Sequence, residues 1–309
     1  MESMSIADLP SGRRAYRLFG DPSSPCVVIE TALAASCAEW WHLAERWSKE
    51  FRVLVHDRAG YGASGKPQRP RSPEHVAEEL LELLDHLGIA RATLLGHSLG
   101  GLFAFVFSRR FPERASALVL VDPVSFEEPR FKRELSKDEY RRSGIDKGFN
   151  LKIGLYLCSA GLGGLLRPLL KKSPPFHYYD GFSKEAERRI LENATSRRMY
   201  GAAIGEYAFI KDDRAMRALG EMPGNPSIPL YLICHTPEVM EKEIAYYGNA
   251  PLEAAARIEA LWRDVMSAYL KTSTDSCLIQ ARNSGHSIHL TDPETILDAI
   301  RASVGHHGK

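Results

Sequence analysis

Short apolar runs alternate with helix-like stretches along the first 123 residues of the chain, and few folds are compatible with such an alternation. Residues 26–30, 52–55 and 117–121 are predicted to be buried strands. Between the last two, Ser72-Pro73-Glu74 has the order cap, proline and acid that begins helices, and leucines follow at helical spacing. Strands that alternate with helices form parallel sheets with helices on both faces, so we predict an α/β fold.

The alternation stops after residue 123 and resumes with the apolar run at residues 228–233. The stretch between contains helical, basic and Gly/Pro-containing segments but no comparable run. We therefore predict a core domain formed by residues 1–123 and 228–309, with residues 124–227 inserted as a helical cap (the cap segment). A helical cap over a parallel sheet would form a pocket where the two units meet.

The composition argues against several classes of protein. Of 309 residues, 44% are hydrophobic and 26% are charged, as in soluble globular domains, which argues against a disordered or fibrous chain. Forty basic and 39 acidic residues leave a net charge of +1, so we expect no nucleic-acid partner. The five cysteines include no CxxC pair, which argues against a disulfide framework or zinc cage. With no signal-peptide pattern apparent, we expect a cytoplasmic protein that is a monomer or homodimer.

The cap segment includes the most apolar stretch of the chain, residues 153–170. Because this stretch carries Arg167, Pro168 and several glycines, we expect a buried or interfacial helical segment and no membrane span. Residues 130–172 hold 11 Lys or Arg against 4 Asp or Glu, an excess of seven positive charges. A solvated helical face explains this excess, and contact with an acidic partner or an anionic membrane surface is the alternative.

The strongest chemical signal is Gly96-His97-Ser98-Leu99-Gly100-Gly101, between a predicted strand and an apolar helix. In that setting, a G-x-S-x-G pattern places the serine on a sharp turn with its hydroxyl exposed. Serine needs a base to become a nucleophile. His286 follows the last predicted strand, and the carboxyl ends of parallel strands meet at one sheet edge, so we expect it beside Ser98. His289 is the nearby rival.

Other chemistries find little support in the sequence. It contains no GxxxxGK[ST], no GxGxxG in a strand–helix–strand setting, no HExxH and no Cys/His cluster. We therefore expect neither a cofactor nor a catalytic metal. For a serine nucleophile, we expect a small-molecule ester or amide as the substrate.

Three motifs together resemble the α/β-hydrolase family: residues 96–101, the stretch Asp57-Arg58-Ala59-Gly60-Tyr61-Gly62-Ala63-Ser64, and Ser284-Gly285-His286. They occur in the family's order, and the chain is most similar to its esterase and prolyl-aminopeptidase-like members. The resemblance implies the α/β-hydrolase fold, Ser98 as the nucleophile that forms an acyl-enzyme, and His286 as the general base. It also implies an oxyanion hole formed by the backbone amides of Leu33 and Leu99, and a structural role for the loop that begins at Asp57.

The carboxylate that orients the histidine has two candidates. In most family members it follows the strand equivalent to residues 230–233, which gives Glu238 here. In a minority it ends the preceding strand, which gives Asp122. We favour Asp122 because its loop and shorter side chain fit better, and Glu238 stays as the alternative.

One loop departs from the family pattern. Many members have His-Gly after the strand equivalent to residues 26–30, where this chain has Glu30-Thr31-Ala32-Leu33. If Ala32 must adopt a positive φ, we expect strain of order 1 kcal/mol or a shifted loop.

The function predicted from these features is hydrolysis of a carboxylic ester with an apolar acyl part. Within enzymes, the alternatives are a prolyl-aminopeptidase-like peptidase, a C–C or lactone hydrolase, or an acyltransferase. The non-enzymatic alternative is a binding protein that has kept the fold while its site has decayed.

Overall fold

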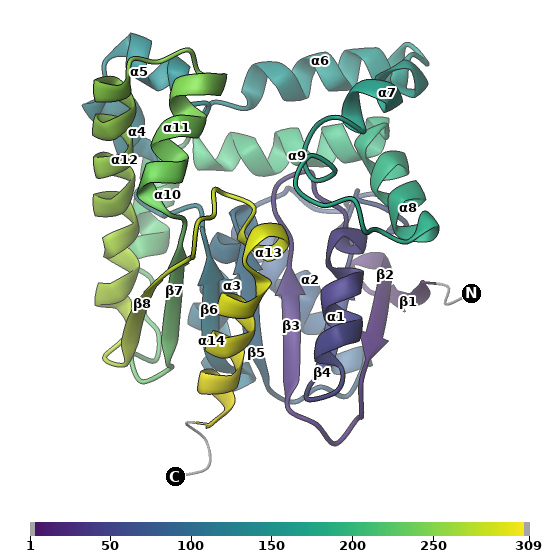
Figure 1. Ribbon diagram of the computed structural model, residues 1–309. Helices are drawn as coiled ribbons and strands as arrows, with labels where there is room; N and C mark the ends of the chain where they lie inside the picture. Colours follow the sequence, from purple (N-terminus) through teal and green to yellow (C-terminus); the bar gives the residue numbers. More distant parts are fainter. Residues whose placement is uncertain (1–3, 306–309) are drawn as a thin grey trace.

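The computed structural model describes residues 4–305, and eight strands form a single sheet (Figure 1). The strand order is β1-β2-β4-β3-β5-β6-β7-β8. β1 and β2 form an antiparallel hairpin and β2 is antiparallel to β4, whereas every neighbouring pair from β4 to β8 is parallel. The strands are Ser5–Leu9, Gly12–Phe19, Cys26–Glu30, Arg52–His56, Ala92–His97, Ala115–Val121, Leu230–Cys234 and Ser276–Gln280.

Helices follow most strands, and both faces of the sheet are covered (Figure 1). The helices outside the cap segment are α1 Trp41–Trp47, α2 Pro73–His86, α3 Leu99–Arg110, α11 Pro237–Tyr247, α12 Leu252–Ser267, α13 Ile288–Thr291 and α14 Pro293–Gly305. Those between β6 and β7 are α4 Pro129–Glu134, α5 Lys137–Arg142, α6 Gly148–Ser159, α7 Arg167–Leu170, α8 Lys184–Ala194, α9 Arg197–Ile210 and α10 Asp213–Gly220. Short 3-10 turns are Cys37–Trp40, Pro112–Arg114, Gly163–Leu166 and Ala268–Thr272.

Alternate residues of the central strands feed two hydrophobic cores. In β3, Val28 packs into the core beneath α2 and α3, whereas Val27 and Ile29 pack into the core beneath α1 and α14. This division follows from the period of two of an extended strand. Because both faces are covered, these strands are continuous apolar runs, and the sequence pattern identified them for this reason.

The predicted α/β class, with a mostly parallel sheet flanked by helices, is confirmed. The sequence analysis missed the β1–β2 hairpin and α11. Strand β2 reads GRRAYRLF, in which charged residues interrupt the apolar ones, because this strand lies near the sheet edge and is only partly buried.

Residues 122–229 form helices and turns without a strand, as expected, and these helices lie across the carboxyl edge of the parallel strands (Figure 1). The division into core and cap stays a prediction, and its outer limits at residues 1 and 309 lie outside the described residues. None of the helices within residues 4–305 combines the length and the apolar character that crossing a membrane requires.

Candidate active site

Ser98 lies on the sharp turn between β5 and α3. Its backbone has φ 54° and ψ −121°, a conformation that non-glycine residues rarely adopt. The turn can be this tight because glycines flank it. A Cβ atom on Gly100 would lie 2.2 Å from the carbonyl oxygen of Glu30, and one on Gly96 would lie 2.4 Å from that of Gly100. The close approach of α3 to β3 and β5 places Ser98 at the carboxyl edge of the sheet.

His286 and Asp122 meet at the same edge. His286 lies in the loop after β8, and its Nδ1 is 2.6 Å from Oδ2 of Asp122, the first residue after β6. The Asp122 side chain is 1% exposed, whereas that of His286 is 46% exposed. Since Nδ1 donates to the carboxylate, Nε2 is the imidazole nitrogen left to accept a proton.

Ser98, Asp122 and His286 line a single cavity of about 860 Å³. Apolar and aromatic side chains from the cap segment and from α11 and α12 form much of its wall: Leu151, Leu170, Ile190, Met199, Tyr200, Tyr207, Ile210, Met240, Ile244, Ile258 and Trp262. A cavity of this size and character suits a small organic molecule.

Neither Glu238 nor His289 joins the pairing of His286 with Asp122, although His289 also lines the cavity. Glu238 is an exposed residue in the first turn of α11 and makes no hydrogen bond to His286. His289, the rival base, is buried and stacks on Trp40, with 4.5 Å between the two ring centroids. Neither nitrogen of its ring has a hydrogen-bond partner among the described residues. His97 donates through Nε2 to the backbone oxygen of His286 at 3.0 Å. Burial, and then the neighbouring His286, lower the pKa of His97 to about 3, so its ring is neutral.

A second histidine holds Asp122 from the other side, and the sequence analysis missed it. His235 directly follows β7, and its Nδ1 lies 2.8 Å from Oδ1 of Asp122, which also accepts the His235 backbone N–H at 3.0 Å. The Nε2 of His235 lies 2.8 Å from Glu259 on α12, and Glu259 in turn accepts a hydrogen bond from Arg263. The available signal was a histidine directly after a parallel strand, next to the strand that Asp122 follows.

Charges alternate along this chain of side chains. Burial alone would lower the pKa of His235, but the carboxylates of Asp122 and Glu259 raise it to about 10, so the ring is an imidazolium. Burial alone would raise the pKa of Asp122, but the His235 charge and hydrogen bonds from both histidines hold that pKa well below its usual range. Asp122 therefore stays ionised while it faces His286.

Replacing His235 by Gln should make stability less dependent on pH. The folded-state pKa of about 10 exceeds the ordinary 6.5, so the imidazolium stabilises the fold fully below pH 6.5 and progressively less up to pH 10. We expect His235→Gln to lose about 2 kcal/mol of unfolding free energy at pH 6 and less at pH 9, in urea titrations at both values. The exposed His86→Gln serves as the control. An equal loss at both pH values would show that His235 is neutral.

The loop after β3 contains Leu33, the predicted oxyanion donor. The backbone N–H groups of Leu33 and Leu99 have no hydrogen-bond partner among residues 4–305, and both residues line the cavity. The loop residue with a positive φ is Ala34, at 63°. Ala32 is not among the positive-φ residues of the described chain, so the condition under which strain was expected at Ala32 is not met. The backbone N–H of Ala34 donates to the hydroxyl of Tyr61 at 3.1 Å, and its carbonyl accepts from Asn193 at 2.8 Å.

Backbone strain is concentrated in the loops around the cavity. Of the five non-glycine residues with positive φ in the described chain, four are Ala34, Ser98, Asp122 and Asn283. They lie in the loops after β3, β5, β6 and β8. Such strain of about 1–3 kcal/mol per residue tends to collect at functional sites, where the surrounding structure enforces it.

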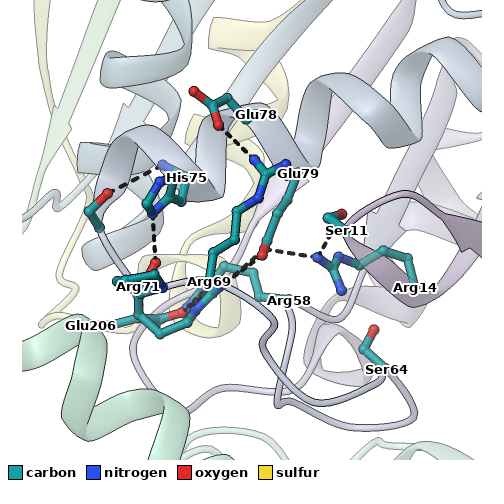
Figure 2. Close-up of polar contacts among 12 residues, drawn as sticks. Ser11, Arg14, Arg58, Ser64, Arg69, Arg71, His75, Glu78, Glu79 and Glu206 are labelled. Carbon is teal, nitrogen blue, oxygen red and sulfur yellow. Dashed lines mark hydrogen bonds and ion pairs between the residues drawn. The ribbon is translucent and has the colours of Figure 1, made fainter.

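A buried network of charges fixes the loop after β3 to Glu206 of the cap segment. Figure 2 shows Glu206 beside Arg58 and Arg71. Glu206 of α9 accepts hydrogen bonds from Arg58, Arg71 and the hydroxyl of Tyr61, at 2.7–3.2 Å. Arg58 also donates to the carbonyl oxygens of Thr31 and Ala32 at 2.7 and 3.0 Å. The backbone directly before Leu33 is thus held by a side chain that is itself held by Glu206.

The same network continues away from the cavity. Arg71 pairs with Glu79 of α2, which also pairs with Arg14 of β2 (Figure 2). These side chains are at most 4% exposed. Buried charges persist only when they are paired and hydrogen-bonded, and this network satisfies both conditions.

The Asp57 side chain holds neighbouring backbone segments together, as expected for a structural role. Its carboxylate accepts the backbone N–H groups of Cys37 and Ala63, each at 3.1 Å. Its backbone oxygen accepts the hydroxyl of Ser64, and the side chain does not line the cavity.

Comparisons with known proteins agree with this architecture. The model of a family described as "alpha/beta hydrolase fold" matches residues 25–186. A relative from Pseudomonas savastanoi pv. phaseolicola, named "Putative carbamate hydrolase RutD", is 35% identical over 285 residues, which cover 90% of this chain and 95% of the relative. The crystal structure of "a putative alpha/beta hydrolase from Nostoc sp PCC 7120" superposes with a TM-score of 0.73 at 18% identity, covering 98% of each chain.

Other relatives match this chain over a smaller share of their own length. The 3-oxoadipate enol-lactonase 2 of Acinetobacter baylyi is 29% identical over 110 residues, which cover 36% of this chain and 41% of that enzyme. Uncharacterised mycobacterial proteins are 34% identical over 109 residues, so the chain spans only 31% of their length. The matched family model covers more than half of the chain, and the RutD relative aligns along nearly all of it. The chain therefore belongs to the α/β-hydrolase family.

Proposed function

We propose that this α/β hydrolase cleaves a carboxylic ester through a covalent intermediate on Ser98. The observation that carries the proposal is the placement of three groups at one cavity: a serine on a strained turn, an imidazole whose Nδ1 donates to a carboxylate, and that buried carboxylate. This is the arrangement that serine hydrolases on unrelated folds share.

The proposed mechanism has two halves. Ser98 Oγ attacks the carbonyl carbon while Nε2 of His286 takes the hydroxyl proton. The tetrahedral intermediate collapses, and the alcohol leaves with the proton from His286. Water then attacks the acyl-enzyme, with His286 again taking a proton and returning it to Ser98. Asp122 orients His286 and stabilises its cation, and it stays ionised throughout.

The oxyanion of each intermediate would be held by backbone amides. The N–H groups of Leu33 and Leu99 fit this role because no other group in the described chain occupies them. Leu99 is the first residue of α3, where helical N–H groups have no partner within the helix. Two such donors are each worth about 3 kcal/mol of transition-state stabilisation in comparable sites.

The apolar wall of the cavity supports an ester with an apolar acyl part. Carbamates and lactones, for which two relatives are named, also have a carbonyl carbon bonded to a leaving heteroatom. The same serine chemistry would serve a cyclic ester. Peptidase, C–C hydrolase and acyltransferase activities stay as predictions from the sequence, as does the alternative of a binding protein.

Labelling with a fluorophosphonate would test the proposal directly. We expect intact-mass spectrometry to show one covalent adduct on the native chain and none on Ser98→Ala. Ser287→Ala is the matched control, since Ser287 also lines the cavity, and it should label normally. A folded native protein that forms no adduct would contradict the proposal and favour the binding-protein alternative.

A further inference from the structure

The outer side of the cap segment carries most of the exposed apolar side chains that the structure describes. Six of the eleven large hydrophobic residues exposed in residues 4–305 lie between positions 149 and 169, on α6, α7 and the segment that connects them. Phe149, Tyr156 and Leu165 are 73–74% exposed. We call the six the apolar ridge: Phe149, Ile153, Tyr156, Leu162, Leu165 and Leu169. Exposed apolar patches of this kind mark interaction sites in soluble proteins.

The ridge is not the face through which α6 packs on the rest of the protein, because α6 packs on α9 with its opposite face. Phe149, Ile153 and Tyr156 are spaced by four and three residues, so they share one face of α6. On the opposite side, Gly154 lies against the ring of Tyr200 of α9, and Leu151 lines the cavity. Helix α6 is the outermost layer over α9 in Figure 1. It therefore lies between the cavity and the solvent.

The segment that carries the ridge contains basic residues and no acidic ones. Residues 149–172 contain Lys152, Arg167, Lys171 and Lys172, all exposed, and no Asp or Glu. Lys171 pairs with Glu187 of α8, whereas the other three have no ion pair in the described part of the chain. The remaining α8 carboxylates, Glu185 and Glu192, are neutralised by arginines of the same helix.

A second cavity opens beside the ridge and is dominated by cations. It has a volume of about 400 Å³, and Arg167 and Lys171 of the α7 region, with Lys184 and Arg188 of α8, line it together with Glu187 and Leu191. Lys171 pairs with Glu187, and Arg188 pairs with Glu185 and Glu192, so the excess of positive charge in this cavity comes from Arg167 and Lys184. We call these four cations the basic cleft; Arg167 and Lys184 have no ion pair among residues 4–305.

We propose that the apolar ridge and the basic cleft dock this protein on an anionic phospholipid surface. The ridge would enter the boundary between headgroups and acyl chains, and the basic cleft would accept a headgroup phosphate. A second copy of the chain fits less well, because a two-fold interface would place the same cations against one another. An anionic lipid surface supplies the missing negative charge along the whole face.

Docking on this face would bring the lipid phase next to the cavity, since only α6 separates the ridge from the cavity wall at Leu151. The proposal goes beyond ester hydrolysis and does not depend on it, because lipid binding is measured without turnover.

Sedimentation with lipid vesicles would test the docking. The full chain is incubated with vesicles of phosphatidylcholine alone, or of phosphatidylcholine and phosphatidylglycerol in equal parts. We expect binding to the anionic vesicles only, weakened by salt. Neutralising two cations, in Arg167→Gln/Lys172→Gln, should weaken binding about 25-fold, at about fivefold for each cation.

The triple variant Phe149→Ser/Tyr156→Ser/Leu165→Ser should lose binding, and its thermal unfolding should stay like that of the native chain. Tyr246→Ser is the matched control, since Tyr246 is 81% exposed on α11 outside the ridge, and it should bind normally. Turnover of a short soluble ester should be unchanged in all of these variants.

Equal binding to both vesicle types, no binding to either, or normal binding by the triple variant would each overturn the proposal. A native dimer that the triple variant converts to a monomer, without vesicle binding, would assign the ridge to a second copy instead. Lack of ester turnover in every variant would bear only on the proposed hydrolysis.

Discussion

Replacing Asp122 by Asn should lower kcat/KM for an activated aryl ester by about four orders of magnitude. The reason is specific to the contacts of this carboxylate. Its Oδ2 fixes His286 in the tautomer that leaves Nε2 free, and its charge stabilises the imidazolium that forms during attack. An amide at this position has no charge, and it can present an N–H to Nδ1 and so favour the wrong tautomer. Steady-state kinetics with the purified variant measure the effect.

The matched control is Glu238→Gln, which alters the competing candidate. Since Glu238 is exposed on α11 and makes no contact with His286, we expect native kinetics from this variant. A large loss in Glu238→Gln combined with an active Asp122→Asn would assign the acid to the loop after β7. Circular dichroism at the assay temperature would show that Asp122→Asn is folded, because Asp122 also neutralises the buried His235.

Replacing Glu206 by Gln should cost about 3–5 kcal/mol of unfolding free energy. Glu206 is 1% exposed and neutralises Arg58 and Arg71, and neither arginine can reach water when its partner is lost. Glu30 and Glu79 remain, but Glu79 already pairs with Arg14 as well. The substitution thus leaves one buried cation without compensation. Urea unfolding of the native and variant chains gives the difference directly.

Glu78→Gln is the control for this experiment. Glu78 neighbours Glu79 in α2 and pairs with Arg69 (Figure 2). It also pairs with Arg110, but its side chain is 31% exposed. Exposed pairs contribute at most about 1 kcal/mol, so we expect a small change. Similar losses in both variants would mean that the Glu206 network is hydrated. In surviving Glu206→Gln protein, a lower kcat with an unchanged KM would reflect the loosened loop before Leu33.

The sequence was most informative where both faces of a strand are buried. Residues 26–30 and 92–95 form apolar runs because helices cover them on both sides, and the structure places β3 and β5 there. The β1–β2 hairpin escaped prediction because its strands are partly exposed and mix arginines with apolar residues. Helix α11 escaped prediction because it begins at Pro237, separated from β7 by only two residues, where the family resemblance implies a loop that carries an acid.

The candidate site was predictable where local geometry determines it, and less so where tertiary contacts do. Ser98 and His286 were identifiable because Ser98 directly follows β5 and His286 lies in the loop after β8, a strand of the same sheet. The choice between Asp122 and Glu238 depends on which carboxylate reaches Nδ1, and no local pattern encodes that distance. The roles of His235, Glu259 and Glu206 were not predicted because each depends on a partner at least 24 residues away.

The pairing of Asp122 with His235 also restricts how the sequence of this site can drift. Each side chain is buried and supplies charge to the other, so a substitution at either position alone removes one charged partner of a buried ion. His235 would keep only Glu259, and Asp122 would keep only His286. Their effects on fitness should therefore be strongly non-additive, as expected for residues in contact. A lineage could transfer the acid from the end of β6 to the end of β7 only by changing both positions almost together, and Glu259 would have to lose its charge as well. Such epistasis would keep the two residues inherited as a unit.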